Sequence, residues 1–183
     1  MPVLFLSRVL KEKGIYETVD AVRILQARRR DVSLMVAGTG EECSRVKSYV
    51  RKYGVRNVSF PGYLRGKEKA AAFLDAYVFC LPSYAEGMPV ALLEAMSFGL
   101  PAVTSPVGGI ADVFVDGVNG FFVAPGDALR VAEGLLRLMD DRDAYISISN
   151  RNYGYARDHF SCAAVARKLD EIYREVILCK AAS

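Results

Sequence analysis

The feature that most constrains the fold of this chain is a repeated alternation of short apolar runs with longer amphipathic segments. Apolar runs of about four to eight residues, bounded by turn residues, are typical of strands that are buried on both faces of a sheet. Six such runs predict six strands. They are PVLFLS from Pro2, SLMVAG from Ser33, NVSFPG from Asn57, YVFCLPS from Tyr77, PAVTSP from Pro101 and NGFFVAP from Asn119.

Between these runs lie segments with helical periodicity, and two or three more helices are expected from about 127 to 179. Strands that alternate with helices imply right-handed βαβ units and a parallel sheet that is covered on both faces. We therefore predict an α/β fold, a Rossmann-like parallel sheet of about six strands, as one domain over residues 1–178 with a disordered tail at 179–183. The earlier predicted helices span 15–30, 41–53, 65–75, 89–98 and 108–115.

Composition excludes several classes of protein. No apolar run approaches the roughly 18 residues that a membrane-spanning helix needs, and the N-terminus lacks a basic leader, so we expect a cytoplasmic protein. The four cysteines are far apart and form no CxxC pair, which predicts reduced, structural thiols. With His159 as the single histidine, the chain lacks the imidazole clusters of most catalytic metal sites. We expect neither a metal nor another cofactor.

The net charge of +3 conceals an asymmetry, because residues 1–75 hold 15 Lys and Arg against 8 Asp and Glu. An anionic ligand near the first half would account for this excess. Alternatively, the run Arg28 to Arg30 simply ends a solvated helix, where cations complement the helix dipole. The basic residues are not interleaved with aromatic residues as in single-stranded nucleic-acid grooves, so we expect no nucleic-acid partner.

The familiar phosphate-binding motifs are missing. A dinucleotide-binding domain would place GxGxxG after the first strand, where this chain has SRVLKEKG. The sequence contains no GxxxxGK[ST] motif, and GTGEEC after the second predicted strand is better explained as a tight turn into a helix whose first turn carries Glu41 and Glu42. NAD binding of the usual kind and P-loop hydrolysis of ATP or GTP are therefore set aside.

Two cations follow the first predicted strand, at the sheet edge where ligands of such folds bind. Arg8 and Lys13 lie in one loop before a helix, and Gly14 permits a close approach of the backbone. Arginine can bind two oxygens at once and lysine adds a mobile charge, so the pair suits a diphosphate. The alternative is that both side chains face solvent, as most charged loop residues do.

The segment EGMPVALLEAMSFGLP, from Glu86 to Pro101, carries a stronger signal. Pro89 suits the first position of a helix, which leaves the amides of Gly87, Met88 and Val90 free to bind a ligand. Residues around Glu94 are apolar on every face, so we expect a buried helix. A buried carboxylate is costly unless it is paired, so Glu94 needs either a partner or a ligand such as a ribose diol.

The stretch PSYAEGMPVALLEAMSFGLPAVTSPVGG resembles the signature of the group 1 glycosyltransferases, which are family 4 of the retaining GT-B enzymes. FLSRVLKEKG, VSFPGYL, DGVNGFFVAPGD and DHFSCAAVARKLDEIY extend the resemblance over almost the whole chain. It departs from the family pattern at Ser7, where glycine is usual, and at Tyr77, where aspartate is common. The chain is thereby identified as similar to the C-terminal half of such an enzyme, which binds the donor.

The resemblance implies a role for each candidate residue. Arg8 and Lys13 would bind the donor diphosphate, Glu94 the ribose, and Glu86 would face the transferred sugar, so that Glu86, Arg8 and Lys13 form the catalytic set. Backbone groups of Gly87, Met88 and Val90 would hold sugar hydroxyls. The stretch 62–64, which includes Leu64, would line the base.

The implied function is the binding of a nucleoside diphosphate sugar (a UDP-, GDP- or ADP-sugar) for retaining, metal-independent transfer to a glycan or lipid acceptor. The resemblance further implies that an N-terminal acceptor domain is missing from this chain, and that the full enzyme associates peripherally with the inner face of the cell membrane. The segment from Phe160 to Val176 is similar to the helix that crosses to that domain. Two alternatives are a nucleotide-sugar-binding module without transfer activity and a fragment of a GT-B sugar-nucleotide epimerase.

Overall fold

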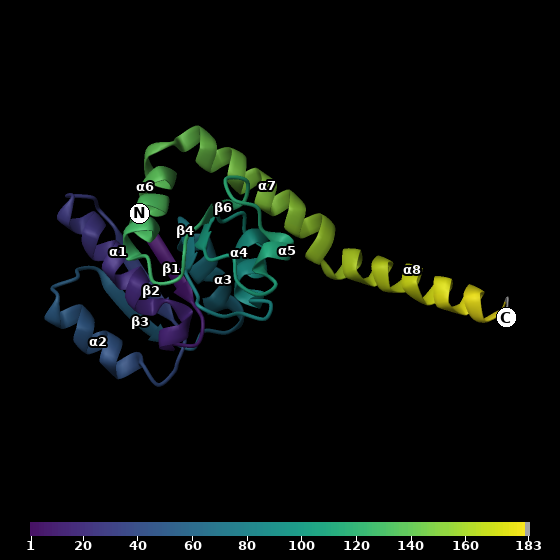
Figure 1. Ribbon diagram of the computed structural model, residues 1–183, viewed down its shortest axis with the longest axis horizontal. Coiled ribbons are helices and arrows are strands. Elements are labelled where there is room, and N and C mark those ends of the chain that lie inside the picture. The colour runs from purple at the N-terminus through teal and green to yellow at the C-terminus, as the bar shows by residue number, and fades with distance from the viewer. Residues whose placement is uncertain (182–183) are drawn as a thin grey trace.

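A computed structural model describes residues 1–181 of the chain, with side chains up to Ile177. Six strands form one sheet in the order β3-β2-β1-β4-β5-β6, and every neighbouring pair is parallel. This is the predicted Rossmann-like α/β fold, in which the sheet lies among the helices (Figure 1), and all six predicted strands are present. The strands are β1 (Pro2–Leu6), β2 (Ser33–Ala37), β3 (Val58–Gly62), β4 (Val78–Leu81), β5 (Ala102–Thr104) and β6 (Gly120–Phe122).

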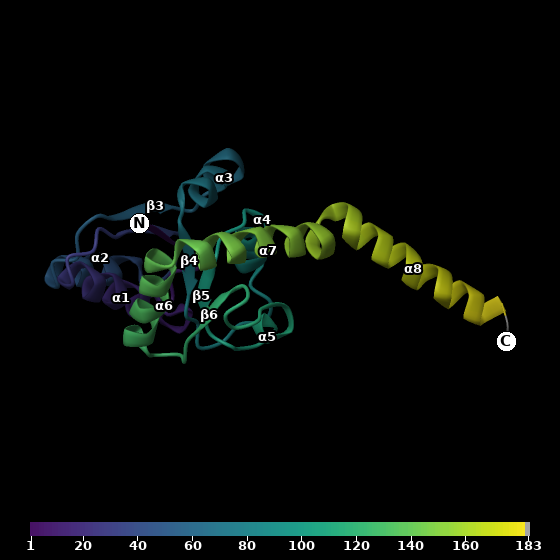
Figure 2. The same ribbon diagram turned by 90° about the horizontal axis from the view of Figure 1, so that it is seen from above.

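Helices cover both faces of the sheet (Figure 2). On one face α1 packs against α6 and α2, and on the other α4 packs against α7. The helices are η1 (Lys11–Lys13, a single 3-10 turn), α1 (Ile15–Ala27), α2 (Cys43–Lys52), α3 (Gly66–Asp75), α4 (Val90–Ser97), α5 (Ile110–Val113), α6 (Ala128–Asp140), α7 (Arg142–Phe160) and α8 (Cys162–Ala181).

The central strands are buried on both faces as predicted, but β3 is not. Ser59 and Pro61 of β3 are exposed, because this strand forms one edge of the sheet and only part of it is covered. Proline has no amide hydrogen to donate, so an edge strand is where a sheet tolerates it. The apolar run NVSFPG therefore predicted the strand correctly, but the prediction that this strand is buried on both faces was wrong.

Two predicted helix boundaries also need correction. The first helix ends at Ala27 instead of residue 30, and Arg28 and Arg29 follow it as exposed residues. Arg30 pairs with Asp140 of α6, 2.7 Å between Nη2 and Oδ1. Glu41 and Glu42 precede α2 and are not in its first turn. Arg30 is therefore joined to α6 by an ion pair, and Arg28 and Arg29 are solvated.

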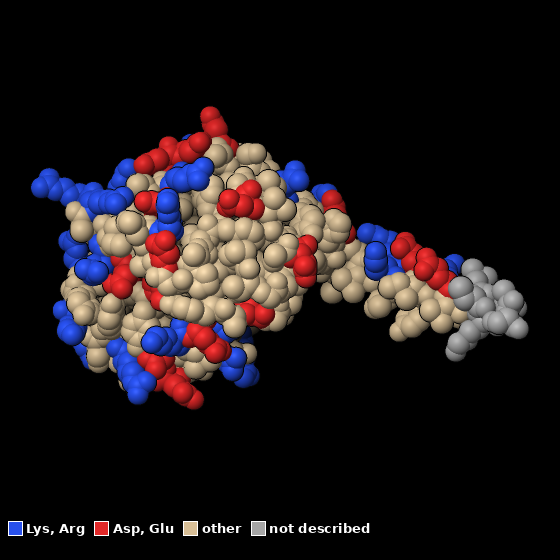
Figure 3. All heavy atoms as spheres, in the orientation of Figure 1, with Lys and Arg blue, Asp and Glu red and all other residues tan. Residues whose placement is uncertain are grey.

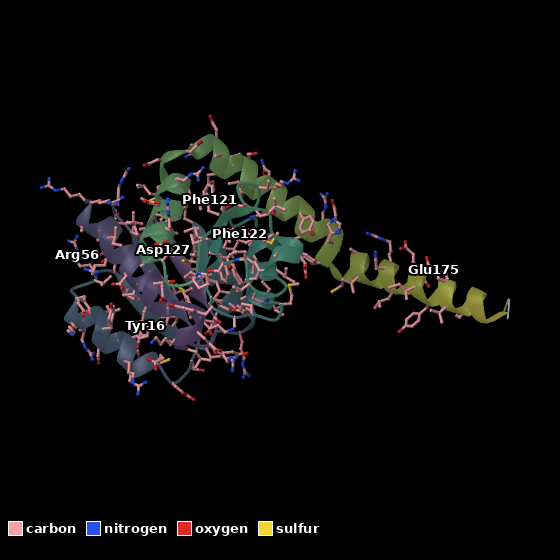
Figure 4. All side chains as sticks on the ribbon, viewed as in Figure 1. Tyr16, Arg56, Phe121, Phe122, Asp127 and Glu175 are labelled. Carbon is pink, nitrogen blue, oxygen red and sulfur yellow. The ribbon has the colours of Figure 1, made fainter. Side chains whose placement is uncertain are left out.

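The last helix, α8, leaves the body of the domain after a turn at Ser161 (Figure 1). Glu175 lies on this projecting segment (Figure 4), and uncharged side chains occupy one side of it (Figure 3). Among residues 1–181, no helix is both long enough and apolar enough to cross a bilayer. The exposed apolar side chains of α8, most of which belong to the segment compared with a crossing helix, are Val165, Leu169, Ile172, Tyr173, Val176 and Ile177.

Sequence positions at the end of the chain are described only in part. The predicted tail at 179–183 begins inside α8, which extends to Ala181, and residues 182–183 lie outside the described part. Cys80 is a buried thiol, as a structural role requires, while Cys43 is half-buried and Cys162 is exposed, and the side chain of Cys179 lies outside the described residues. Burial raises the pKa of the Cys80 thiol to about 12, which makes it an unreactive core residue.

A buried pair of amides joins α7 to the loops at the end of the sheet. Asn152 of α7 donates to the carbonyl oxygens of Leu100 at 2.8 Å and Asn119 at 3.0 Å, and it accepts from Nδ2 of Asn119 at 2.7 Å. Asn119 in turn accepts from the amide of Val115 at 2.9 Å. Every amide group of Asn152 that the fold buries is therefore paired, which stabilises the end of the sheet.

Asn152→Ala should lower the free energy of unfolding by about 2–4 kcal/mol, because it leaves buried carbonyl and amide groups without partners. Asn150→Ala is the matched control, since Asn150 is exposed on the same helix and should change stability by no more than about 0.5 kcal/mol. Urea unfolding followed by circular dichroism measures both. Equal small losses for the two variants would show that the amide network contributes nothing.

Candidate functional site

A pocket of about 360 Å³ opens at the carboxyl ends of β1, β2 and β4. The sheet order places β1 beside β4, and the chain runs outward from these two strands in opposite directions. This switch point is where open α/β sheets bind ligands. The pocket is lined by Leu6, Ser7, Arg8, Lys13, Ala37, Gly38, Thr39, Tyr63, Leu64, Lys69, Leu81, Glu86, Pro89, Val90, Ala91 and Glu94.

Lys13 and Glu86 form an ion pair at the floor of this pocket. Lys13 Nζ lies 3.0 Å from Glu86 Oε2, and each side chain is 9% exposed. Lys13 also donates to the carbonyl oxygen of Ala85 at 3.0 Å, and Ser83 Oγ donates to Glu86 Oε1 at 2.7 Å. Lysine and glutamate are seldom buried without such partners. Lys13 was predicted in a loop and lies in the 3-10 turn η1 between β1 and α1, and its charge is neutralised within the protein and does not face solvent.

Arg8, by contrast, extends from the end of β1 with its side chain 74% exposed. Its nearest carboxylate is that of Glu12, at 3.9 Å, which is a long contact for an ion pair. The guanidinium therefore remains available to an anion that enters the pocket. The structure brings together the two cations predicted from SRVLKEKG. Lys13 is paired with Glu86, and Arg8 is available to a ligand.

Glu94 has a protein partner on one of its two oxygens. Oε1 of Glu94 lies 2.6 Å from Nζ of Lys69, which belongs to α3, and the side chain of Lys69 is 29% exposed and that of Glu94 34%. Oε2 is buried and accepts no hydrogen bond. The predicted need for a partner or a ligand is thus met for one oxygen, and the second still lacks a donor.

The start of α4 differs from the prediction in two respects. Pro89 is the N-cap, one position before the first helical residue. Val90 lines the pocket and is 64% exposed, so the helix is not buried on every face. Apolarity alone indicated burial, whereas a helix that begins at a pocket must expose its first turn there. Gly87 and Met88 are exposed and lie outside the pocket lining, so the structure does not bring them together with the other predicted residues.

The loop after β5 holds the segment that carries Glu86. The amide of Gly109 donates to the carbonyl oxygen of Gly87 at 2.6 Å. Gly108 has a φ of 56°, and a Cβ atom there would lie 1.8 Å from the carbonyl oxygen of Glu86. Only glycine fits this position, because both the left-handed backbone and the contact exclude a side chain. The backbone of Glu86 is therefore clamped between β4 and this loop.

Comparison with known proteins now identifies the family. Residues 2–156 match the family model described as glycosyl transferases group 1. The chain belongs to this glycosyltransferase family. The match spans β1 to α7 and so includes every residue that lines the pocket.

Curated relatives are similar to this chain over less than half of their own length. The putative colanic acid biosynthesis glycosyltransferase WcaL of Salmonella typhimurium is 28% identical over 96% of this chain and 45% of its own. Glycogen synthase of Mycobacterium tuberculosis is 31% identical over 76% of this chain and 34% of its own. The chain therefore spans less than half the length of these relatives.

Solved structures confirm the fold. Anabaena Alr3699/HepE, solved in complex with UDP-glucose, is similar to this chain with a TM-score of 0.84 and 21% identity over 95% of this chain and 48% of HepE. The C-terminal domain of the group 1 glycosyl transferase LpcC from Francisella tularensis has a TM-score of 0.78 and 20% identity, over 88% of this chain and 86% of that domain. The fold is that of a GT-B glycosyltransferase half.

Sequence reasoning missed two pocket residues of this glycosyltransferase domain. Lys69 was not singled out, because its partner Glu94 is 25 residues away and no local pattern joins them. Tyr63 lies within the stretch predicted to line a base, but it was given no role of its own. It is 64% exposed, and the guanidinium of Arg65 lies 5.0 Å from the centre of its ring. The signal in the sequence is an aromatic residue directly after a predicted strand, at the carboxyl end of the sheet where ligands bind.

Groups that could bind a metal ion were also sought among the described residues. In this part of the chain, no three His, Cys, Asp or Glu side chains come together as ligands. The two carboxylates of the pocket are each paired with a lysine. Metal-independent chemistry therefore stays a prediction.

Gly108→Ala should destabilise the domain more than a glycine-to-alanine substitution at another position with the same backbone conformation. Gly54, with a φ of 64° and no atom within 4 Å of its Cβ position, is the matched control. Gly54→Ala should cost about 1 kcal/mol of unfolding free energy from backbone strain alone. Gly108→Ala should cost about 1–3 kcal/mol more, because a methyl group collides with the Glu86 carbonyl. Equal losses in denaturant unfolding would disprove the clamp.

Proposed function

We propose that this chain is the donor-binding domain of a retaining glycosyltransferase, which binds a nucleoside diphosphate sugar and transfers its hexose to a glycan or lipid acceptor. The observation that supports this best is the pocket itself. It places two lysine-paired carboxylates and an available arginine around one cavity at the switch point of the sheet. Anabaena HepE is described with UDP-glucose, and the pneumococcal O-GlcNAc transferase GtfA with UDP and GlcNAc, so UDP is the first ligand to test.

The diphosphate of the donor would bind at Arg8 and Lys13. Arg8 is exposed at the pocket and has only a long contact to Glu12, so a diphosphate oxygen can become its main partner. Lys13 is fixed by Glu86 and Ala85, which places its charge before the ligand arrives. Charge builds up on the diphosphate when its bond to the anomeric carbon breaks. Fixed cations beside it stabilise that charge without reorganisation.

Glu86 would face the transferred sugar. Its carboxylate is oriented by Lys13 and Ser83, and its backbone is held by the loop at Gly108. A carboxylate held in this way can accept hydrogen bonds from sugar hydroxyls, or stabilise positive charge on the sugar ring as the leaving group departs. Val90, at the first turn of α4, would add its backbone amide, while Gly87 and Met88 act only if the loop moves.

The nucleoside would bind on the other side of the pocket. Glu94 offers a buried oxygen without a donor, which a ribose hydroxyl satisfies. Tyr63 and Leu64 follow β3 and line the same pocket, so a base can lie against them. Stacking of a base on an aromatic ring contributes about 1–3 kcal/mol. We propose no metal and no other cofactor, since Arg8 supplies positive charge for the diphosphate and Lys13 can share its charge between Glu86 and the ligand.

The acceptor would be held by an N-terminal domain beyond this chain. The curated relatives are about twice as long as the matched segment, and α8 presents an apolar side that nothing covers among the described residues. We propose that α8 packs on that domain, and that the full protein acts in the cytoplasm at the inner face of the membrane. Transfer requires that the acceptor be positioned and that water be kept out, which one open half of a cleft does not achieve.

Arg8→Ala should weaken UDP binding about 10-fold or more and leave uridine binding almost unchanged, because it removes a charge-assisted contact to phosphate only. Lys11→Ala is the matched control. Lys11 is exposed, belongs to the same loop and does not line the pocket, so its loss should change UDP affinity by less than about twofold. Isothermal titration calorimetry gives the four affinities. An equal loss for UDP and uridine would contradict the diphosphate assignment.

The 183-residue chain alone should bind a nucleoside diphosphate without transferring sugar. Donor contacts all come from residues in its pocket, whereas the acceptor contacts are expected from the N-terminal domain. Titration with UDP, GDP and ADP should reveal one preferred ligand. A panel of sugar nucleotides, assayed for released nucleotide, should show only slow hydrolysis. Rapid transfer by pure monomeric protein would place the acceptor site in this chain. It would refute the proposal that a separate N-terminal domain binds the acceptor.

A further inference from the structure

Lys69 of α3 and Glu94 of α4 lie beside an aromatic contact that joins the same two segments. Phe73 of α3 stacks on Phe98, which caps α4, with ring centres 5.1 Å apart and planes 18° from parallel. Lys69 lies four residues before Phe73, and Glu94 lies four residues before Phe98. Residues four apart occupy the same face of a helix, so the aromatic stack sets the two helices in a register that brings the lysine to the carboxylate.

The two oxygens of Glu94 are therefore in different states. Oε1 is occupied by Lys69 Nζ at 2.6 Å, and Oε2 is buried with no donor. An unpaired buried oxygen is costly, and Glu94 is one of the residues that line the pocket, from which a ligand can supply the missing hydrogen bond. A carboxylate that is held by one oxygen has lost most of its rotational freedom, so the other oxygen points in a defined direction.

We propose that Lys69 is a positioning residue of the donor site. It holds Glu94 by one oxygen and thereby directs the other toward the vicinal diol of the ribose, so it determines the preference of the site for ribose over a sugar without those hydroxyls. This inference rests on the proposed function, since it assumes that the pocket binds a nucleoside diphosphate. Lys69 itself needs no contact with the ligand.

The prediction distinguishes orientation from simple charge. If Lys69 acted only as a cation near the pocket, its removal would weaken every nucleoside diphosphate by the same factor. If it orients Glu94, its removal should weaken the ribonucleotide and spare the analogue that lacks both ribose hydroxyls. The ratio of the two affinities is therefore the quantity to measure, because a general loss of binding or of folded protein cancels in it.

The experiment uses UDP and 2′,3′-dideoxy-UDP with the whole chain, or the GDP or ADP pair if that nucleotide binds better. We expect wild type to prefer the ribonucleotide about 10-fold or more, because hydrogen bonds to charged groups are strong. Glu94→Gln should reduce the preference to about twofold, and Lys69→Met should lower it at least fivefold. Lys69→Arg should keep most of it, since arginine can still bind the carboxylate.

Lys67→Met is the matched control, because Lys67 is exposed on the same helix and lies outside the pocket. It should leave the preference at the wild-type value. A wild-type preference in Lys69→Met, with both ligands weakened equally, would overturn the positioning role and leave the proposed function intact. Nucleoside diphosphates that bind wild type without any preference for the ribose hydroxyls would refute the role of Glu94 and this inference together. Thermal unfolding of each variant confirms that folded protein is compared.

Discussion

The buried ion pair between Lys13 and Glu86 is the interaction on which the rest of the site depends. It joins the loop after β1 to the loop after β4 across the switch point, where the chain leaves the sheet in two directions. Taking two charges out of water is costly, and additional hydrogen bonds from Ser83 and to Ala85 offset that cost. A site built on such a pair is rigid, because removing either partner leaves the other charge buried and alone.

The same loops are brought close by a second constraint, which involves the backbone. Gly14, directly after η1, has a φ of 71°, and a Cβ atom there would lie 2.2 Å from the carbonyl oxygen of Pro82. The close approach that this glycine permits is therefore to the loop after β4, and not to a ligand as the sequence suggested. Backbone contact between the two loops brings Lys13 within reach of Glu86. The backbone contact and the ion pair thus hold the same two loops together.

The sequence predicted the fold almost completely because its strongest signals are local. Apolar runs and helical periodicity located all six strands, and the pattern around Pro89 placed α4 within one residue. Burial was predicted less well, since it depends on neighbours: β3 is an edge strand, and Val90 faces the pocket. The residues Arg8, Lys13, Leu64, Glu86, Val90 and Glu94 do line one pocket, although their predicted roles in donor binding and catalysis stay predictions.

The pairing of these residues could not be read from the sequence, for a physical reason. Lys13 with Glu86 and Lys69 with Glu94 are contacts between elements that lie far apart in the chain, and each depends on the angle at which two elements pack. A shift of a helix by one residue is a rise of about 1.5 Å, which is enough to make or break an ion pair between two side chains. Composition indicated a basic first half, but it did not show that two of its lysines are already neutralised.

This neutralisation changes how the pocket attracts an anion. Two lysines paired with two carboxylates contribute almost no net charge, so Arg8 is the lining cation that lacks a close carboxylate. A diphosphate would therefore meet Arg8 first, and would engage Lys13 only by sharing it with Glu86. Such sharing brings the negatively charged phosphate close to the Glu86 carboxylate, which is proposed to face the sugar. The phosphate and the carboxylate repel each other, and only the lysine between them makes their proximity tolerable. The arrangement suits the proposed donor, in which the sugar is neutral and the diphosphate is anionic.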